Sequence, residues 1–158
     1  RCTTELKKKV RKAYQQIGDT HIFGLTYDEQ PRIERFEKDN PDIDLEWNLR
    51  DNKLTKRDCL RMVKEAGIEL PMMYRLGYKN NNCIGCVKGQ SGYWNKIRKD
   101  FPERFDKMAN MERFIGHAIN KDKNGAVYLD ELDPKRGRLK EDMPGDCGFT
   151  CEVKDVNS

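Results

Sequence analysis

The sequence has little histidine and lacks several common functional patterns. Only His21 and His117 occur in its 158 residues, and neither has a serine or aspartate at a recognisable triad spacing. The complete glycine-rich patterns of P-loop and dinucleotide-binding proteins are missing, and Lys88-Gly-Gln-Ser-Gly92 matches only part of a phosphate loop. No apolar run approaches the length of a membrane helix, and no signal-peptide pattern is visible. These absences argue against a triad hydrolase, a standard nucleotide-binding loop and a membrane partner.

The composition is that of a small and highly charged protein. Charged residues make up 37% of the chain and apolar residues 36%, so we expect a modest core. The formal net charge is +4 with both signs well mixed, which suits an anionic small molecule or weak contact with nucleic acid. The chain begins at Arg1, in a stretch typical of the interior of a protein. We therefore expect a fragment or a processed product.

Four of the six cysteines form two closely spaced pairs. Cys83 and Cys86 flank Gly85, a spacing that lets two thiolates of one tight turn point at the same atom. Cys147 and Cys151 form a second pair near the C-terminus. Together the four could complete a tetrahedral thiolate site, with zinc as the predicted metal and an iron–sulfur cluster as the alternative. Two disulfides, or small buried thiols without a ligand, are the other interpretations.

The remaining two cysteines have simpler interpretations. Cys59 lies on the apolar face of a predicted helix, where it is best explained as a small buried hydrophobe. Cys2 precedes a helix whose dipole would lower its pKa, so it is either a ligand or reactive thiol, or an inert residue at a frayed end. The lysine-rich composition and the C-x2-C turn favour a reducing cytoplasm, with thiols used as ligands or nucleophiles.

The first half of the chain alternates helices with strands. Helices are predicted over residues 4–17, 28–38 and 56–66, and strands over residues 21–26 and 43–49. The first helix carries an apolar face of Leu6, Val10, Tyr14 and Ile17. This order corresponds to half of a doubly wound α/β layer. Because two strands make too small a sheet to stand alone, we expect the missing N-terminal half of the domain as a partner.

The second half is predicted to be helical and then irregular. A helical region over residues 92–119 carries an aromatic stripe and breaks at Pro102. Residues 126–129 follow a Lys-Asn-Gly turn and predict a hairpin arm, with a calcium loop from Asn120 as the less favoured alternative. From Asp133 onward we expect an irregular tail, held chiefly by its two cysteines.

The chain is therefore expected to have two parts. Residues 1–70 are predicted to form a partial α/β layer of the nucleotide-hydrolase type. Residues 71–158 are predicted to form a helical extension that contains the cysteine pairs and the irregular tail.

Several stretches resemble the phosphoadenosine phosphosulfate reductase family. Cys2-Thr-Thr-Glu-Leu-Lys7 is similar to its Cys-Thr-x-x-Leu-Lys segment, and Phe23-Gly-Leu-Thr-Tyr-Asp-Glu29 with Arg32 is similar to its strand followed by an acidic residue and an arginine. Gly145-Asp-Cys-Gly-Phe-Thr-Cys151 resembles the C-terminal Glu-Cys-Gly signature. Leu70-Pro-Met-Met-Tyr-Arg-Leu-Gly-Tyr78 and the Cys83 turn resemble phage and bacterial reductase-like members. The resemblance covers residues 2–152.

The resemblance implies a fold and a chemistry. The fold would be the second half of an adenine-nucleotide alpha-hydrolase-like, Rossmann-like layer with a cysteine-anchored helical extension. Cys147 would be the catalytic nucleophile that attacks the sulfur of an adenylyl sulfate, and a thiol reductant would then release sulfite. Lys7, Arg32 and Arg35 would bind the phosphate or sulfate of the substrate.

Two departures from the family leave alternatives open. The N-terminal Ser-Gly-Gly-x-Asp-Ser nucleotide loop of the family is absent, and Thr150 stands where the reductases have histidine. An ATP-dependent sulfurtransferase or nucleotidyl enzyme of the same scaffold is one alternative. A metal-stapled binding module without catalysis is the other.

Overall fold

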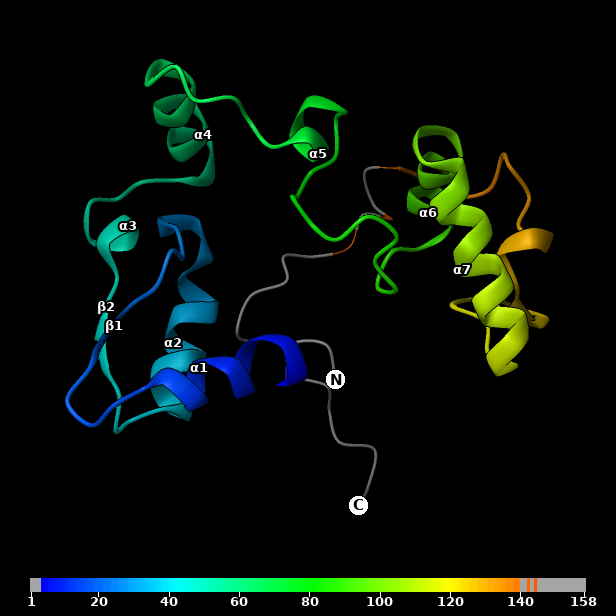
Figure 1. Cartoon of the computed structure of the whole chain (residues 1–158). Coiled ribbons are helices and arrows are strands. Elements are labelled where there is room, and N and C mark those ends of the chain that lie inside the picture. Colours follow the sequence, from blue (N-terminus) through cyan, green and yellow to red (C-terminus); the bar gives the residue numbers. More distant parts are fainter. Residues whose placement is uncertain (1–3, 140–141, 143, 145–158) are drawn as a thin grey trace. The chain divides into compact units, whose positions relative to one another are not determined.

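The computed structural model describes residues 4–139, 142 and 144 of the chain. They form an α/β protein with two small sheets, arranged in two compact units, one within Arg1–Leu70 and the other within Pro71–Asp146 (Figure 1). These are named the first unit and the second unit. Across the described residues, no helix combines the length and the apolar character that a membrane span requires.

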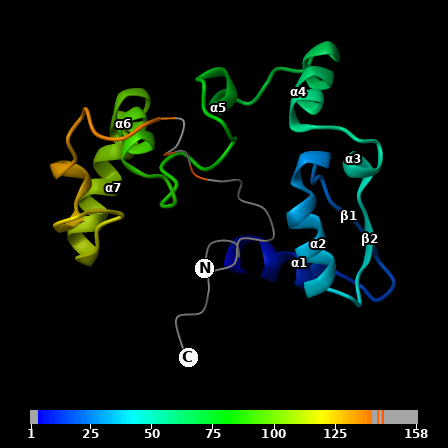
Figure 2. The ribbon, with the colours of Figure 1, turned by 180° about the vertical axis from the view of Figure 1, so that it is seen from behind.

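The first unit is built on two short parallel strands. β1 (Thr20–Ile22) pairs with β2 (Asp44–Glu46) so that Thr20 faces Asp44 (Figure 2). The chain crosses between them through the 3-10 turn η2 (Tyr27–Glu29) and α2 (Gln30–Asp39). This is the predicted strand–helix–strand order, although both strands are shorter than expected. The core of this unit consists of Phe23, Ile33, Phe36 and Trp47.

Capping residues determine where the helices of the first unit begin. Thr26 and Glu29 form a capping box ahead of α2, so the cap lies two residues before the predicted Asp28. The short α3 (Asn48–Asp51) was not predicted. The helix α4 (Lys56–Glu65) begins after Thr55, as the sequence predicts.

The cap at Thr55 should contribute measurably to stability. Thr55 accepts a hydrogen bond from the Asp58 N–H, and the Asp58 carboxylate accepts one from the Thr55 N–H at 3.0 Å. We expect Thr55→Ala to lower the free energy of unfolding by about 1 kcal/mol, whereas Thr55→Ser should retain most of it. The Thr55 hydroxyl also lowers the pKa of Asp58, so the cap weakens as the pH falls through that lowered pKa. Urea titrations followed by circular dichroism at neutral and acidic pH measure both effects.

The first helix is shorter and more exposed than the sequence suggests. The chain forms a π-helical turn, η1 (Thr4–Lys8), and then α1 (Lys9–Tyr14), so the helix ends before Ile17. The side chains of the predicted apolar face are exposed: Leu6, Val10, Tyr14 and Ile17. The helical spacing predicted a helix at this place in the chain, and its apolar face is exposed because the core cluster of the first unit lies on other elements.

The second unit is mainly helical. It contains α5 (Met72–Arg75), α6 (Ser91–Asp100) and α7 (Pro102–Ile115), and the break between the last two falls at Pro102 as predicted. A left-handed Gly116 ends α7. The core lies under α6 and α7 and includes Tyr78, Tyr93, Trp94, Ile97, Phe105 and Leu129.

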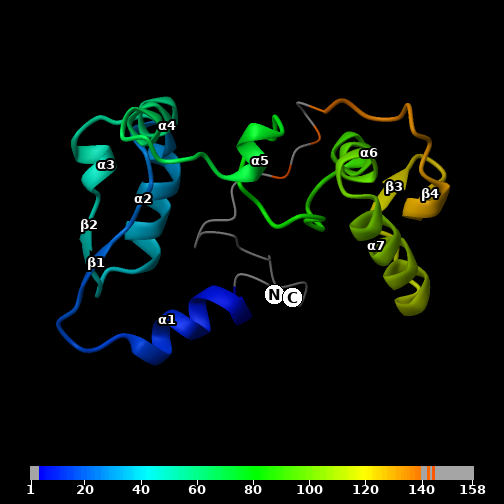
Figure 3. The ribbon, with the colours of Figure 1, turned by 45° about the horizontal axis from the view of Figure 1, so that its top comes forward.

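A short hairpin follows α7. β3 (Asn120–Asp122) pairs antiparallel with β4 (Gly125–Val127), which leads into the 3-10 turn η3 (Leu129–Glu131) (Figure 3). The Asp122 carboxylate accepts a hydrogen bond from the Asn124 N–H and pairs with Arg136, so it has protein partners at this turn. The hairpin interpretation of this stretch is confirmed.

Candidate metal centre

The first cysteine pair lies in an irregular turn between α5 and α6. Cys83 is exposed, whereas Cys86 is partly buried and packs against the core of the second unit. Gly85 between them has φ +77°, a left-handed conformation that side chains rarely adopt, and a Cβ there would lie 3.3 Å from the Trp94 ring. The glycine therefore permits both the shape of the turn and its close approach to the core. Among the described cysteines, Cys59, Cys83 and Cys86, none forms a disulfide.

Tyr93, in the first turn of α6, contacts this turn from the core side. Its hydroxyl accepts hydrogen bonds from the N–H groups of Gly85 (3.0 Å) and Cys86 (2.9 Å) and donates one to the Cys83 carbonyl (3.1 Å). Burial raises the pKa of Tyr93, so the side chain remains a protonated phenol. The backbone of the cysteine turn is thus held by a neutral side chain.

The chain returns to this turn near its C-terminus. The side-chain amides of Asn80 and Asn82 both donate to the Pro144 carbonyl, at 3.0 and 3.1 Å. Asn80 is buried, so this contact lies within the second unit and not at its surface. A residue three positions before Cys147 is therefore fixed beside the segment that leads directly into Cys83.

The segment before Pro144 is anchored at the start of α6. The Asp142 carboxylate accepts hydrogen bonds from the N–H groups of Gly92 (2.7 Å) and Arg138 (2.8 Å), and its carbonyl accepts one from the Gln90 N–H (3.0 Å). The backbones also meet closely, since a Cβ on Gly137 would lie 2.2 Å from the Gly92 nitrogen. Backbone N–H groups of the partial phosphate-loop pattern at residues 88–92 therefore donate to Asp142 of the same chain.

These contacts add to the prediction for the tail. We expected the residues after Asp133 to be held chiefly by Cys147 and Cys151, which lie outside the described residues. In the described part of the tail, the Asn95 amide donates to the carbonyls of Asp133 and Arg136, and the Asp142 carboxylate accepts a hydrogen bond from the Gly92 N–H in the first turn of α6. The described part of the tail has extensive polar contacts of its own.

The remaining metal-site predictions fall on residues without a description. Cys147 and Cys151, like Cys2, lie outside the described residues. Within the described part of the chain, no group of three or more histidine, cysteine, aspartate or glutamate side chains is gathered for a metal. Cys83 and Cys86 therefore supply two thiols from one turn, and the second pair is required to complete the predicted site.

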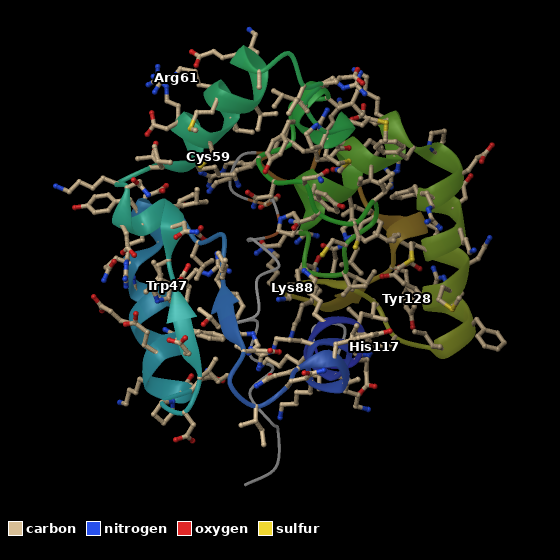
Figure 4. The ribbon with its side chains drawn as sticks, turned by 60° about the vertical axis from the view of Figure 1, so that its left-hand side comes forward. Trp47, Cys59, Arg61, Lys88, His117 and Tyr128 are labelled. Carbon is tan, nitrogen blue, oxygen red and sulfur yellow. The ribbon has the colours of Figure 1, made fainter. Side chains whose placement is uncertain are left out.

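Cys59 belongs to a different environment. It lies on α4 in the first unit, where burial raises its pKa and Asp58 adds to the effect (Figure 4). A raised pKa keeps the thiol neutral, which disfavours both metal binding and nucleophilic attack. Cys59 is consequently a natural control for experiments on the other cysteines.

The predicted anion-binding cations lie on two helices of the first unit. Arg32 and Arg35 lie on α2, where Arg32 forms an ion pair with Glu29 of the capping box. Arg35 and Lys7 are exposed, and Lys7 lies on η1. Arg32 follows the carboxyl end of β1, the edge at which parallel α/β layers bind ligands. The role of the three cations in substrate binding stays a prediction.

Sequence reasoning missed the residues that hold the cysteine turn. No prediction singled out Asn80 or Asn82, and Tyr93 lay only within the aromatic stripe predicted over residues 92–119. The available signals were the run of three asparagines before Cys83 and the glycine at position 89, four residues before the tyrosine. Asp142 had no recognisable local signal.

No family model, curated protein or solved structure matches this chain. The resemblance to the phosphoadenosine phosphosulfate reductase family therefore stays a prediction from the sequence motifs.

Proposed function

We propose that Cys83, Cys86, Cys147 and Cys151 form a thiolate metal centre in a sulfonucleotide reductase-like protein. The observation that supports this most directly is the double hydrogen bond from Asn80 and Asn82 to the Pro144 carbonyl. Three residues of chain reach at most about 11 Å, which is enough to bring Cys147 to the turn that carries the first pair.

The donor set suits a soft, tetrahedral ion. Four cysteine thiolates are a typical structural zinc set, and the same ligands also accept an iron–sulfur cluster, the alternative cofactor. The metal would join the C-terminal pair to the turn of the second unit and add binding free energy to its folding. A reducing compartment such as the cytoplasm would keep the thiols available.

Metal binding by the whole chain tests the centre. We expect the reduced protein to bind Zn²⁺ in a one-to-one ratio, measured by elemental analysis after dialysis under anaerobic conditions. Cys83→Ser should lose the ion, whereas Cys59→Ser should keep it because Cys59 lies on α4 with a raised pKa. A wild-type protein that binds no zinc or iron, or a Cys83→Ser variant that retains it, would contradict the proposal.

The second candidate function is reduction of an adenylyl sulfate by Cys147. The Cys147 thiolate would attack the substrate sulfur and break its bond to the nucleotide phosphate oxygen, leaving a thiosulfonate on the cysteine and releasing the nucleotide. A second thiol would then attack the Cys147 sulfur, release sulfite and form a disulfide that an external thiol reductant reduces. The exposed thiol of Cys83 favours this candidate, since Pro144 lies three residues before Cys147 and its carbonyl accepts a hydrogen bond from Asn82, the neighbour of Cys83 in the chain.

Alkylation of Cys147 separates the two candidates. A metal ligand should react slowly with iodoacetamide in the native protein and quickly after a chelator is added. Fast labelling without chelator would favour the reductase. Peptide mass spectrometry identifies the labelled cysteine, with Cys59 as the internal reference. Zinc on all four thiols, with no binding of adenine sulfonucleotide or ATP, would instead favour a metal-stapled binding module.

A further inference from the structure

The Tyr93 hydroxyl bonds three backbone groups of the cysteine turn. It accepts from the N–H groups of Gly85 and Cys86 and donates to the Cys83 carbonyl, at distances of 2.9–3.1 Å. The side chain is 1% exposed. A phenol can make one donated and two accepted hydrogen bonds, so this hydroxyl is fully used on the turn.

The surrounding sequence makes room for this side chain. A Cβ at Gly89 would lie 2.0 Å from Cδ1 of the Tyr93 ring, so any larger residue there would displace the ring. The ring also packs edge-on against the rings of Tyr78 and Trp94, with distances between ring centroids of 5.9 and 5.6 Å. The hydroxyl is therefore held at a fixed position by the core, and the cysteine turn is held by the hydroxyl.

We propose that Tyr93 is a positioning residue that fixes the Cys83–Cys86 turn in the geometry that receives the metal. This inference rests on the proposed metal centre. A free turn with two thiols must be ordered when the ion binds, and that ordering reduces the affinity. Here Tyr93 already holds three backbone groups of the turn, the N–H groups of Gly85 and Cys86 and the Cys83 carbonyl, once the second unit has folded.

The hydroxyl also determines which groups surround the thiolates. The N–H groups of Gly85 and Cys86 are directed to the Tyr93 oxygen, so they are not donors to a cysteine sulfur. Groups outside the ligand set orient metal ligands, and their removal costs about 10–100-fold in metal affinity. In Tyr93→Phe the two N–H groups lose their acceptor and can turn toward sulfur, which would withdraw electron density from the metal–thiolate bonds.

Cobalt titration of the whole chain tests the role of Tyr93. Co²⁺ substitutes for Zn²⁺ at thiolate sites and reports the ligands by its absorption. We expect Tyr93→Phe to weaken Co²⁺ binding by at least about tenfold. We also expect its sulfur-to-cobalt charge-transfer band to move to shorter wavelength, because hydrogen-bonded sulfur gives up its electrons less readily.

Tyr78→Phe is the matched control. Tyr78 is buried in the same core, but its hydroxyl donates to the Asp100 carboxylate at 2.9 Å and makes no described hydrogen bond to the turn. Both variants remove one buried hydroxyl and keep the ring. Tyr78→Phe should lower the unfolding temperature and leave the Co²⁺ affinity and spectrum unchanged.

Amide hydrogen exchange in the metal-free protein gives an independent measurement. The Gly85 and Cys86 amides should exchange faster in Tyr93→Phe than in the wild type, and at the wild-type rate in Tyr78→Phe. Gly89→Ala, which displaces the ring without removing the hydroxyl, should reproduce the weaker Co²⁺ binding if Tyr93→Phe fails to fold.

The outcomes separate this inference from the metal centre itself. If Tyr93→Phe binds Co²⁺ with the affinity and spectrum of the wild type, the positioning role alone is overturned. Equal losses in Tyr93→Phe and Tyr78→Phe would overturn it as well, since they would reflect stability only. A wild-type protein that binds no Co²⁺ would overturn the metal centre and the positioning role together.

Discussion

Gly137→Ala is expected to lower the stability of the second unit by about 3 kcal/mol. Gly137 has φ +91°, and a left-handed conformation costs an L-residue about 1–2 kcal/mol. A Cβ there would also lie 2.2 Å from the Gly92 nitrogen and 2.3 Å from the Asp142 carboxylate. Since the first of these neighbours is backbone, the collision requires the chain to move, at a further cost of about 1–3 kcal/mol.

The same substitution should affect the proposed metal centre. Moving Gly137 away from Gly92 would break the contacts of Asp142 with the start of α6, and Pro144 follows two residues later. We therefore expect weaker zinc binding in Gly137→Ala. Urea unfolding followed by the amide resonances of α6 and α7 measures the stability, and competition with a zinc chelator dye measures the affinity.

Gly77→Ala is the control for backbone strain. Gly77 has φ +80° in the same unit, but a Cβ there has no atom within 4 Å. Gly77→Ala should therefore lower the free energy of unfolding by about 1–2 kcal/mol, the conformational cost without the collision. Its zinc affinity should be unchanged. Equal effects of the two substitutions would show that the close contact between Gly92 and Gly137 is unimportant.

Glu112→Ala should lower the free energy of unfolding by about 3–5 kcal/mol. The Glu112 side chain is 1% exposed, and its carboxylate accepts hydrogen bonds from the Ile119 N–H and, at 2.6 Å, from the Leu129 N–H. It thus joins α7 to both ends of the hairpin β3–β4. Alanine would leave two N–H groups without this acceptor, at about 1–3 kcal/mol each, and a cavity as well.

Glu112→Gln distinguishes hydrogen bonding from packing. Glutamine preserves the shape of the side chain, but its NH₂ group cannot accept the second N–H. We expect Glu112→Gln to lower the free energy of unfolding by about 1–3 kcal/mol, so that its stability lies between those of the wild type and Glu112→Ala. Thermal unfolding followed by near-UV circular dichroism measures the series, and a Glu112→Gln variant less stable than Glu112→Ala would contradict the explanation.

Local signals in the sequence predicted much of the secondary structure. Thr55 and Pro102 determine where α4 and α7 begin through contacts within one turn, and both were identified correctly. The apolar spacing of the first helix predicted a helix, but burial depends on which elements are available to cover a face. Leu6 and Tyr14 therefore lie exposed despite a regular pattern.

The candidate site was predicted only in part, for the same reason. The C-x2-C spacing identified the turn because its two cysteines are close in sequence. The groups that hold it are polar side chains whose partners depend on the tertiary fold. Nothing in the composition around Asn80 shows that its partner is a proline carbonyl in the tail, and nothing around Tyr93 shows that its hydroxyl faces backbone.

The contact between Asn80 and Pro144 also has a consequence for the order of events during synthesis. The two residues are 64 positions apart, so a ribosome that adds about 5–20 residues per second makes the partner carbonyl roughly 3–13 s after the asparagine. During this interval the nascent chain presents Cys83 and Cys86 without the C-terminal pair. In the proposed metal centre, an ion captured then would have only two protein thiolates and would exchange readily with cellular thiols, so its retention would depend on completion of the chain.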